Sequence, residues 1–152
     1  MNAKEWRKRL GFGILLFLLI SLPIACYKWM QPKTGENLAS TLWVSTPQGA
    51  KNISFFGAGL LWPATAYEFD IREETFLKWA QQHGWKLQTI NGEDPFCIET
   101  YKSLKIQDRS EAEKQMKEIT RGYKYEYRKG DQALLIGYDN LAGRAYVFRR
   151  TR

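Results

Sequence analysis

Two carboxylates, Glu68 and Asp70, are the arrangement in this sequence nearest to an acid–base pair. They lie in the segment Thr65–Ile71, whose alternating apolar and polar residues predict a half-buried strand. Residues two apart on a strand share a face, so both side chains should lie together, as the acid and base of a hydrolase do. The interpretation we prefer is that Asp70 caps the following helix and that Glu68 is a polar residue on the outer face of the strand.

The chain has one histidine, His83, at the end of the same predicted helix, where it can interact with the last carbonyl groups. No serine or cysteine nucleophile stands in a recognisable motif beside a base. One histidine and two cysteines without a C-x-x-C pair argue against a metal site. Gly57 and Gly59 begin a dinucleotide-like pattern, but Trp62 occupies the third glycine position. We therefore predict no catalytic residue, no cofactor and no metal.

A row of tyrosines and a basic edge form the candidate ligand surface. Tyr123, Tyr125 and Tyr127 alternate with charged residues, so the three rings should share one strand face. Such a row stacks on sugars or bases when it is exposed, but it also serves as core beneath helices, which is the interpretation we prefer. Arg144 and Arg149 belong to a basic C-terminal edge that is either solvated or docks on an acidic polymer or partner.

The first half of the domain is predicted to hold strands at Ile53–Phe56 and Thr65–Ile71, a helix at Arg72–His83 and a strand at Trp85–Ile90. Asp70 and Glu73 would form the capping box of this helix, and Gly84 follows its end.

A second helix should begin at the S-x-x-E capping box of Ser110 and Glu113 and end before Gly122. Residues 93–109 show no clean period. Three strands then form a meander at Tyr123–Arg128, Ala133–Tyr138 and Arg144–Arg149. The expected fold class is α+β, with a mostly antiparallel sheet of about five or six strands and two helices on one face.

An uncharged run, Leu10–Tyr27, follows four basic residues near the N-terminus. As a helix, these 18 residues would extend about 27 Å, close to the roughly 30 Å hydrocarbon core of a bilayer. We predict that residues 10–27 form a transmembrane anchor. The excess of basic residues before it places residues 1–9 in the cytoplasm and the rest of the chain outside, as a single-pass cell-membrane protein.

Two other interpretations of the same run remain. One is a secretory signal peptide, since residues 12–22 have the length of its apolar region. The other comes from Leu22-Pro23-Ile24-Ala25-Cys26, which is similar to the lipobox of bacterial lipoproteins, with Pro23 where that pattern has leucine. The resemblance implies that Cys26 becomes the lipidated first residue of the mature chain. We expect the other cysteine, Cys97, to be a small buried residue.

The remaining chain divides into a linker, residues 28–51, rich in turn-forming residues, and an exported α+β domain, residues 52–152. The formal net charge of +7 includes the four basic residues before the apolar run, so the domain itself is only mildly basic. That charge suits proximity to anionic headgroups or an anionic polymer and does not indicate nucleic-acid binding.

These observations favour a membrane-anchored, extracytoplasmic binding or assembly module without enzymatic activity. Its expected partners are the lipid bilayer, through residues 10–27, and an envelope protein or anionic polymer, with no nucleic acid. The alternatives are a lipoprotein or envelope enzyme acting on a glycan or lipid through Glu68 and Asp70, and an inhibitor or immunity-type protein that neutralises a toxin.

Overall fold

The computed structural model describes residues 21, 23, 27, 31–58 and 63–151, and the chain divides into two compact units, 1–31 and 32–152. Most of the predicted membrane segment, residues 10–27, and the predicted lipidation site, Cys26, lie outside the described residues. Within the described part, no helix combines the length and the apolar character needed to cross a membrane. The second unit holds all the strands described below.

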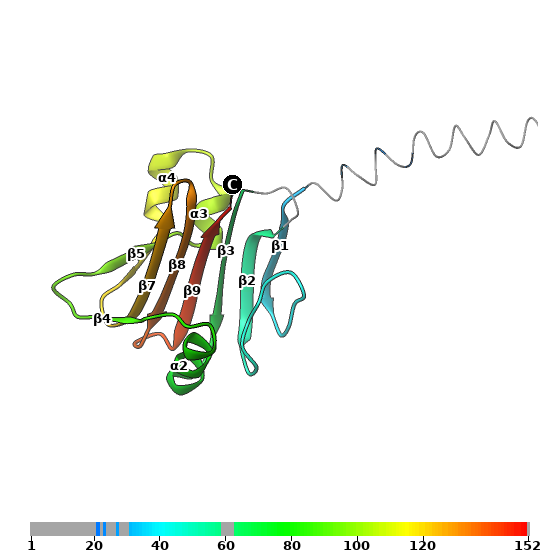
Figure 1. Cartoon of the computed structure of the whole chain (residues 1–152). Helices are drawn as coiled ribbons and strands as arrows, with labels where there is room; N and C mark the ends of the chain where they lie inside the picture. The colour runs from blue at the N-terminus through cyan, green and yellow to red at the C-terminus, as the bar shows by residue number, and fades with distance from the viewer. Residues whose placement is uncertain (1–20, 22, 24–26, 28–30, 59–62, 152) are drawn as a thin grey trace, which may run out of the picture. The chain divides into compact units, whose positions relative to one another are not determined.

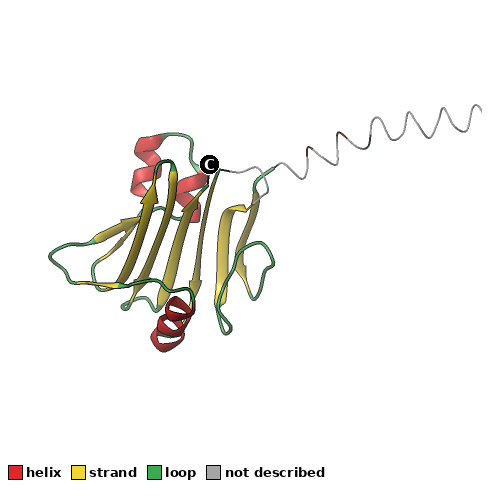
Figure 2. Cartoon of the chain, in the orientation of Figure 1, coloured by secondary structure: helices red, strands yellow, loops and turns green. Residues whose placement is uncertain are grey.

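A seven-stranded antiparallel sheet forms the centre of this unit (Figures 1 and 2). Its spatial order is β1 (Lys33–Leu38), β2 (Lys51–Ala58), β3 (Ala64–Asp70), β9 (Arg144–Arg150), β8 (Gln132–Asp139), β7 (Gly122–Lys129) and β4 (Gln88–Ile90). A second, two-stranded sheet pairs β5 (Phe96–Ile98) with β6 (Lys117–Ile119). The predicted α+β class and the antiparallel C-terminal meander are confirmed, and the main sheet has more strands than we expected.

The helices of the described residues lie on both faces of the sheet. They are α2 (Glu73–Gln82), α3 (Tyr101–Lys105) and α4 (Arg109–Lys114). Helix α2 packs on one face, here called the α2 face, whereas α3 contacts β2 and β3 from the opposite face (Figure 1). The expectation of two helices on one face is therefore wrong.

The core under α2 is rich in aromatic rings. Phe76 is fully buried and stacks on Tyr138 with 4.7 Å between ring centroids. Trp79 meets Phe69 edge to face at 5.6 Å. The hydroxyl of Tyr138 donates a hydrogen bond of 3.0 Å to the carbonyl of Ile71, so its polar end is also satisfied. These contacts fix α2 against the middle of the sheet.

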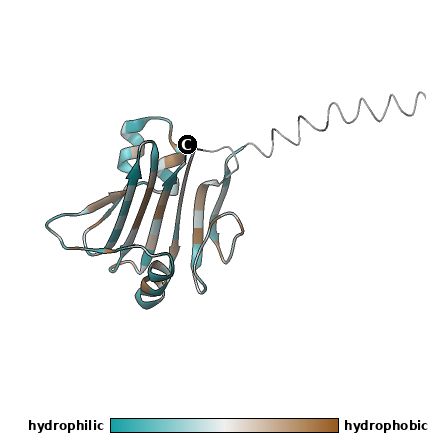
Figure 3. Ribbon diagram, in the orientation of Figure 1, coloured by the Kyte–Doolittle hydropathy of each residue, from teal (hydrophilic) through white to brown (hydrophobic). Residues whose placement is uncertain are grey.

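The opposite face is covered mainly by the small β5–β6 sheet. Phe96, Ile98 and Ile119 are buried against the main sheet, together with Leu135 of β8. Gly137 permits this close approach, because a Cβ atom there would lie 2.5 Å from Ile119 Cδ1. Figure 3 shows apolar residues along the central strands, whereas α4 is polar and buries no residue.

Two predicted helix starts are corrected. Asp70 does not cap α2: the residue at the N-cap is Arg72, and it makes no capping side-chain bond. Asp70 instead pairs with Arg144 across the sheet. The N-cap of α4 is Asp108, whereas we predicted Ser110. The carboxylate of Asp108 accepts a hydrogen bond of 2.8 Å from the backbone N–H of Ser110. This helix ends at Lys114 because the chain then pairs as β6 with β5.

Strand β1 lies within residues 28–51, which the sequence analysis assigns to a linker. It pairs with β2 at one edge of the sheet, with register shifts along its length. Gly35 lies on the ring of Phe55, where a Cβ atom would come within 2.7 Å. The backbone of β1 approaches the Phe55 ring closely because position 35 is a glycine. An alternating strand pattern would need an apolar side chain at that position, so the sequence of β1 shows no recognisable alternation.

The turn between β8 and β9 depends on the buried carboxylate of Asp139. Its Oδ1 accepts from the backbone N–H groups of Leu141 and Ala142, and its Oδ2 lies 2.7 Å from Lys117 Nζ. Burial acts to raise the pKa of Asp139, but the Lys117 ammonium and these N–H groups outweigh it and hold the pKa below its ordinary value of 3.8.

We expect Asp139→Asn to lower the free energy of unfolding by about 1 to 3 kcal/mol near neutral pH, because the charged bond to Lys117 is lost. A depressed carboxyl pKa stabilises the fold above the unfolded value of 3.8, and this stabilisation disappears as the pH falls through the lower folded value. The difference between wild type and variant should therefore shrink in acid. Urea unfolding at several pH values measures it, with exposed Asp131→Asn as the control; a pH-independent difference would contradict this account.

Candidate functional site

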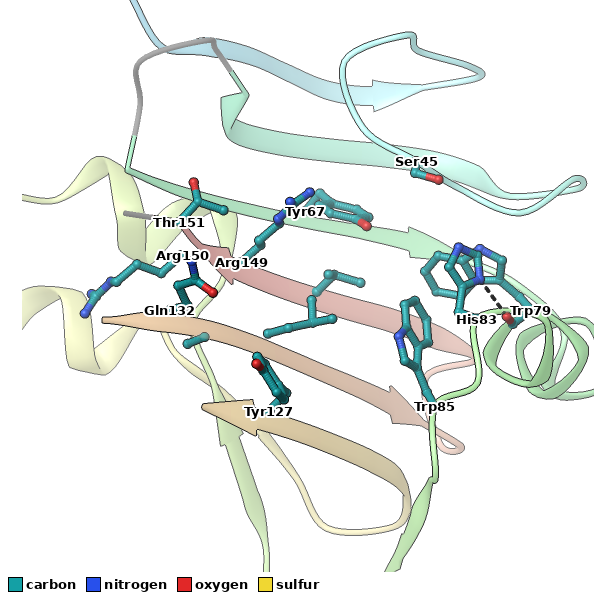
Figure 4. A pocket seen from close by; sticks show the side chains of 13 residues that line it. Ser45, Tyr67, Trp79, His83, Trp85, Tyr127, Gln132, Arg149, Arg150 and Thr151 are labelled. Atoms are coloured by element: carbon teal, nitrogen blue, oxygen red, sulfur yellow. Dashed lines mark hydrogen bonds between the residues drawn. The ribbon is translucent and has the colours of Figure 1, made fainter. Parts of the chain in front are cut away.

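A cavity of about 380 Å³ opens on the part of the α2 face that the helix leaves uncovered (Figure 4). We call it the groove. Its floor comes from Tyr67 of β3, Leu134 of β8 and Val147 of β9. Trp79 and Trp85 form one wall, and Ser45, from the loop between β1 and β2, lies on another side.

The tryptophan wall is held by stacked rings. Trp79 meets Trp85 edge to face at 4.8 Å, and the Trp85 ring lies 4.5 Å from His83 and 6.0 Å from Tyr125, at 26° to each. His83 is fixed in turn by a 2.9 Å hydrogen bond between its Nδ1 and the carbonyl of Trp79. The groove wall is thus an extension of the aromatic core.

The tyrosine row on β7 is divided between core and groove. Tyr123 and Tyr125 are partly buried and pack against the core, and the hydroxyl of Tyr123 donates to Glu73 Oε1 at 2.6 Å. Tyr127, at the end of the row, is 44% exposed and lines the groove. The core interpretation fits the first two rings, whereas the third ring is exposed and its role as a ligand surface stays a prediction.

The two candidate arginines lie on different faces of β9. Arg149 lines the groove, and Figure 4 shows its side chain reaching toward Tyr67. Burial raises the pKa of the Tyr67 phenol, and the Arg149 charge offsets this only in part, so Tyr67 keeps its proton and can donate a hydrogen bond. Arg144, an odd number of positions earlier, faces the other way. The structure does not bring these two arginines together.

Arg144 and the two candidate carboxylates form a separate cluster on the opposite face. Arg144 Nη2 lies 3.0 Å from Glu68 Oε1, and Nη1 pairs with Asp70 Oδ1. The side-chain amide of Asn52 donates a hydrogen bond of 2.6 Å to Asp70 Oδ2. The backbone carbonyl of Asn52 accepts one of 3.2 Å from Arg144 Nη2. Burial raises the pKa of Glu68, while the Arg144 charge acts in the opposite direction. The carboxylates do share a face, but a guanidinium occupies the space between them.

Other candidate chemistry is sparse in the described residues. Their His, Cys, Asp and Glu side chains include no group of three that would hold a metal ion. Cys97 is exposed, so the expectation that it is buried is wrong. It is the middle residue of β5, whose neighbours Phe96 and Ile98 both face the core, and alternation therefore turns its side chain outward.

Sequence reasoning missed most of the groove. Its lining includes Ser45, Tyr67, Trp79, His83 and Trp85, none of which were selected as ligand residues. One available signal was the spacing of Trp79 and His83, which are four apart and so share a helix face. Scans and searches against protein-family models, curated proteins and solved structures found no match to this chain.

Proposed function

We propose that this protein is a membrane-anchored, non-enzymatic binding protein whose extracytoplasmic domain holds a glycan chain in the groove. The observation that carries the proposal is the composition of the groove lining: aromatic and apolar side chains with hydroxyl, amide and guanidinium groups, and no carboxylate among the described lining residues. A mostly apolar cavity with a few oriented polar groups is typical of ligand sites.

The position of the groove favours recognition through side chains. Strands β3, β9 and β8, which form its floor, are each hydrogen-bonded to neighbours on both sides. Their backbone groups are therefore engaged and cannot pair with a peptide strand. Sugar rings need no backbone partner, because they present C–H groups to an aromatic face and hydroxyls to polar side chains. Tyr127, Tyr67 and Ser45 supply both kinds of contact.

The proposed location depends on the N-terminal sequence. Residues 10–27 are long and apolar enough to span a bilayer, and the basic residues before them favour a cytoplasmic N-terminus. The domain beginning at Pro32 would then lie on the outer side of the membrane, close to envelope polysaccharide. In that position the groove would be within reach of the polysaccharide that we propose it binds.

Binding fits the arrangement of acidic residues better than glycan hydrolysis does. A glycosidase of the common type places two carboxyl groups on either side of the bond that it cleaves. Here Glu68 and Asp70 lie on the face opposite the groove and are paired with Arg144. The envelope-enzyme alternative would require that ion-pair cluster to open.

The test is calorimetric titration of the full chain in detergent micelles with hexasaccharides of glucose, N-acetylglucosamine and galacturonic acid. We expect at least one to bind, and Tyr127→Ala to weaken it about tenfold, since an aromatic contact contributes roughly 1 kcal/mol or more. Leu141→Ala is the control, because Leu141 is 74% exposed and lies outside the groove. Absence of binding by all three probes, or equal binding by Tyr127→Ala, would overturn the proposal, and release of shorter sugars would favour an enzyme.

A further inference from the structure

We infer that the groove selects an acidic glycan and that Arg149 pairs with the carboxylate of its sugar. This inference rests on the proposed glycan-binding function and adds the charge of the ligand. It starts from the charges in the groove, where Arg149 presents its guanidinium group and the described lining contains no acidic side chain. A neutral ligand would leave this positive charge without a counterpart.

Arg149 differs from the other arginines of β9 in what it contacts. Arg144 is occupied by two carboxylates, and Arg150 lies 5.7 Å from the ring of Phe148 on the opposite face. Arg149 is exposed and has no carboxylate partner among the described residues. Its planar fork of N–H donors therefore remains available, and that fork matches the two oxygens of a carboxylate.

The strand register places Arg149 at a suitable distance from the aromatic contact. Tyr127 pairs with Leu134, and Leu134 pairs with Arg149, so the three residues form one row across β7, β8 and β9. Neighbouring strands are about 4.8 Å apart, which puts the Cα atoms of Tyr127 and Arg149 roughly 10 Å apart. That span corresponds to about two sugar rings.

The row predicts an orientation for the bound glycan. One ring would lie against Tyr127, its apolar face would cross Leu134, and an acidic group on the same or the next ring would reach the Arg149 guanidinium. Because the groove is open to water, the ion pair would be screened by salt, and its main effect would be discrimination between acidic and neutral glycans.

The experiment compares hexagalacturonate with its fully methyl-esterified form, which has the same rings without the charge. We expect the full chain in detergent micelles to bind the acid at least tenfold more tightly at low ionic strength. Arg149→Gln should remove this preference, and Arg149→Lys should retain part of it. Added salt should reduce the preference in the wild type and in Arg149→Lys, which keep a positive side chain at position 149, but not in Arg149→Gln. Arg121→Gln, which changes an exposed arginine outside the groove, should keep the wild-type preference.

The possible failures are distinguishable. If neither form binds but the glucose or N-acetylglucosamine hexasaccharide does, glycan binding stands and the acidic selectivity is overturned. If none of these glycans binds, the proposed function itself is overturned. If both bind with equal affinity, or if Arg149→Gln keeps the preference while its thermal unfolding matches wild type, glycan binding stands and the acidic selectivity is overturned. If Arg149→Gln is less stable than wild type, Arg149→Lys decides the question. A stable Lys variant that binds the acid and the ester with equal affinity would also refute the role of the charge.

Discussion

Arg144→Met should destabilise the domain by about 3 kcal/mol, because it leaves Glu68 and Asp70 facing each other without their shared cation. The side chains of Arg144 and Glu68 are only 17% and 14% exposed, so water replaces the lost guanidinium poorly. We place the effect at the low end of the range for buried ion pairs since Asp70 keeps 38% of its side chain exposed. Urea unfolding of the full chain in detergent, followed by tryptophan fluorescence, measures this difference.

Removing the carboxylate charges should reverse most of the loss. In the triple variant Arg144→Met, Glu68→Gln, Asp70→Asn, no uncompensated charge remains, and we expect stability to return to within about 1 kcal/mol of wild type. A carboxyl pKa raised by folding means that the fold is favoured as the pH falls, since protonation relieves the buried charge. The Arg144→Met variant should therefore be closer to wild type in mild acid than at neutral pH. A loss that charge removal does not restore would show that Arg144 acts through packing alone.

Phe76→Ala should cost about 4 kcal/mol, the usual effect of removing a fully buried aromatic side chain. The ring has no exposed surface, stacks on Tyr138 at 4.7 Å and lies 6.2 Å from Trp79. Its loss leaves a cavity between α2 and the sheet that these neighbours can fill only in part. Since small domains are stable by roughly 5 to 15 kcal/mol, a large share of the total would disappear.

Two variants of the same helix test the cause. Phe76→Leu keeps most of the apolar volume and should cost clearly less than Phe76→Ala. Lys78→Ala changes an exposed residue on α2 and should alter stability by less than about 0.5 kcal/mol. Because Trp79 supports the groove wall, Phe76→Ala should also weaken the glycan binding that we propose, under conditions where the domain is still folded. Equal unfolding free energies for Phe76→Ala and Lys78→Ala would contradict the assignment of Phe76 to the core.

Local patterns predicted the elements whose information lies within a few consecutive residues. Strands β3 and β7 alternate over seven or eight residues, β8 is a short apolar run between turns, and the three strands of the meander appear close to their expected bounds. Helix α2 shows its acidic first turn and the following Gly84. Strands β5 and β6 have only three residues each, which is too short for a period to emerge.

The misassigned residues depended on partners that are distant in the sequence. Asp70 fits a capping box when only its neighbours are considered, but its partner, Arg144, is 74 residues away and opposite it in the β3–β9 register. The groove has the same origin, because its lining comes from the loop after β1, from α2 and the segment that follows it, and from four strands. Tyr127 was identified because it belongs to a visible row, whereas Tyr67 and Trp85 have no local pattern that distinguishes a groove from a core.

The last described strand, β9, lies in the middle of the sheet, and this order governs when the domain can assemble during synthesis. Until residues 144–150 have emerged, the block of β1, β2 and β3 and the block of β8, β7 and β4 lack the strand that joins them. The polypeptide therefore cannot complete its sheet until synthesis is nearly finished, and on the export route that we propose it would still be unfolded while it crosses the membrane. A premature stop codon at Arg144 would release two half-sheets with open apolar faces, a target for proteases.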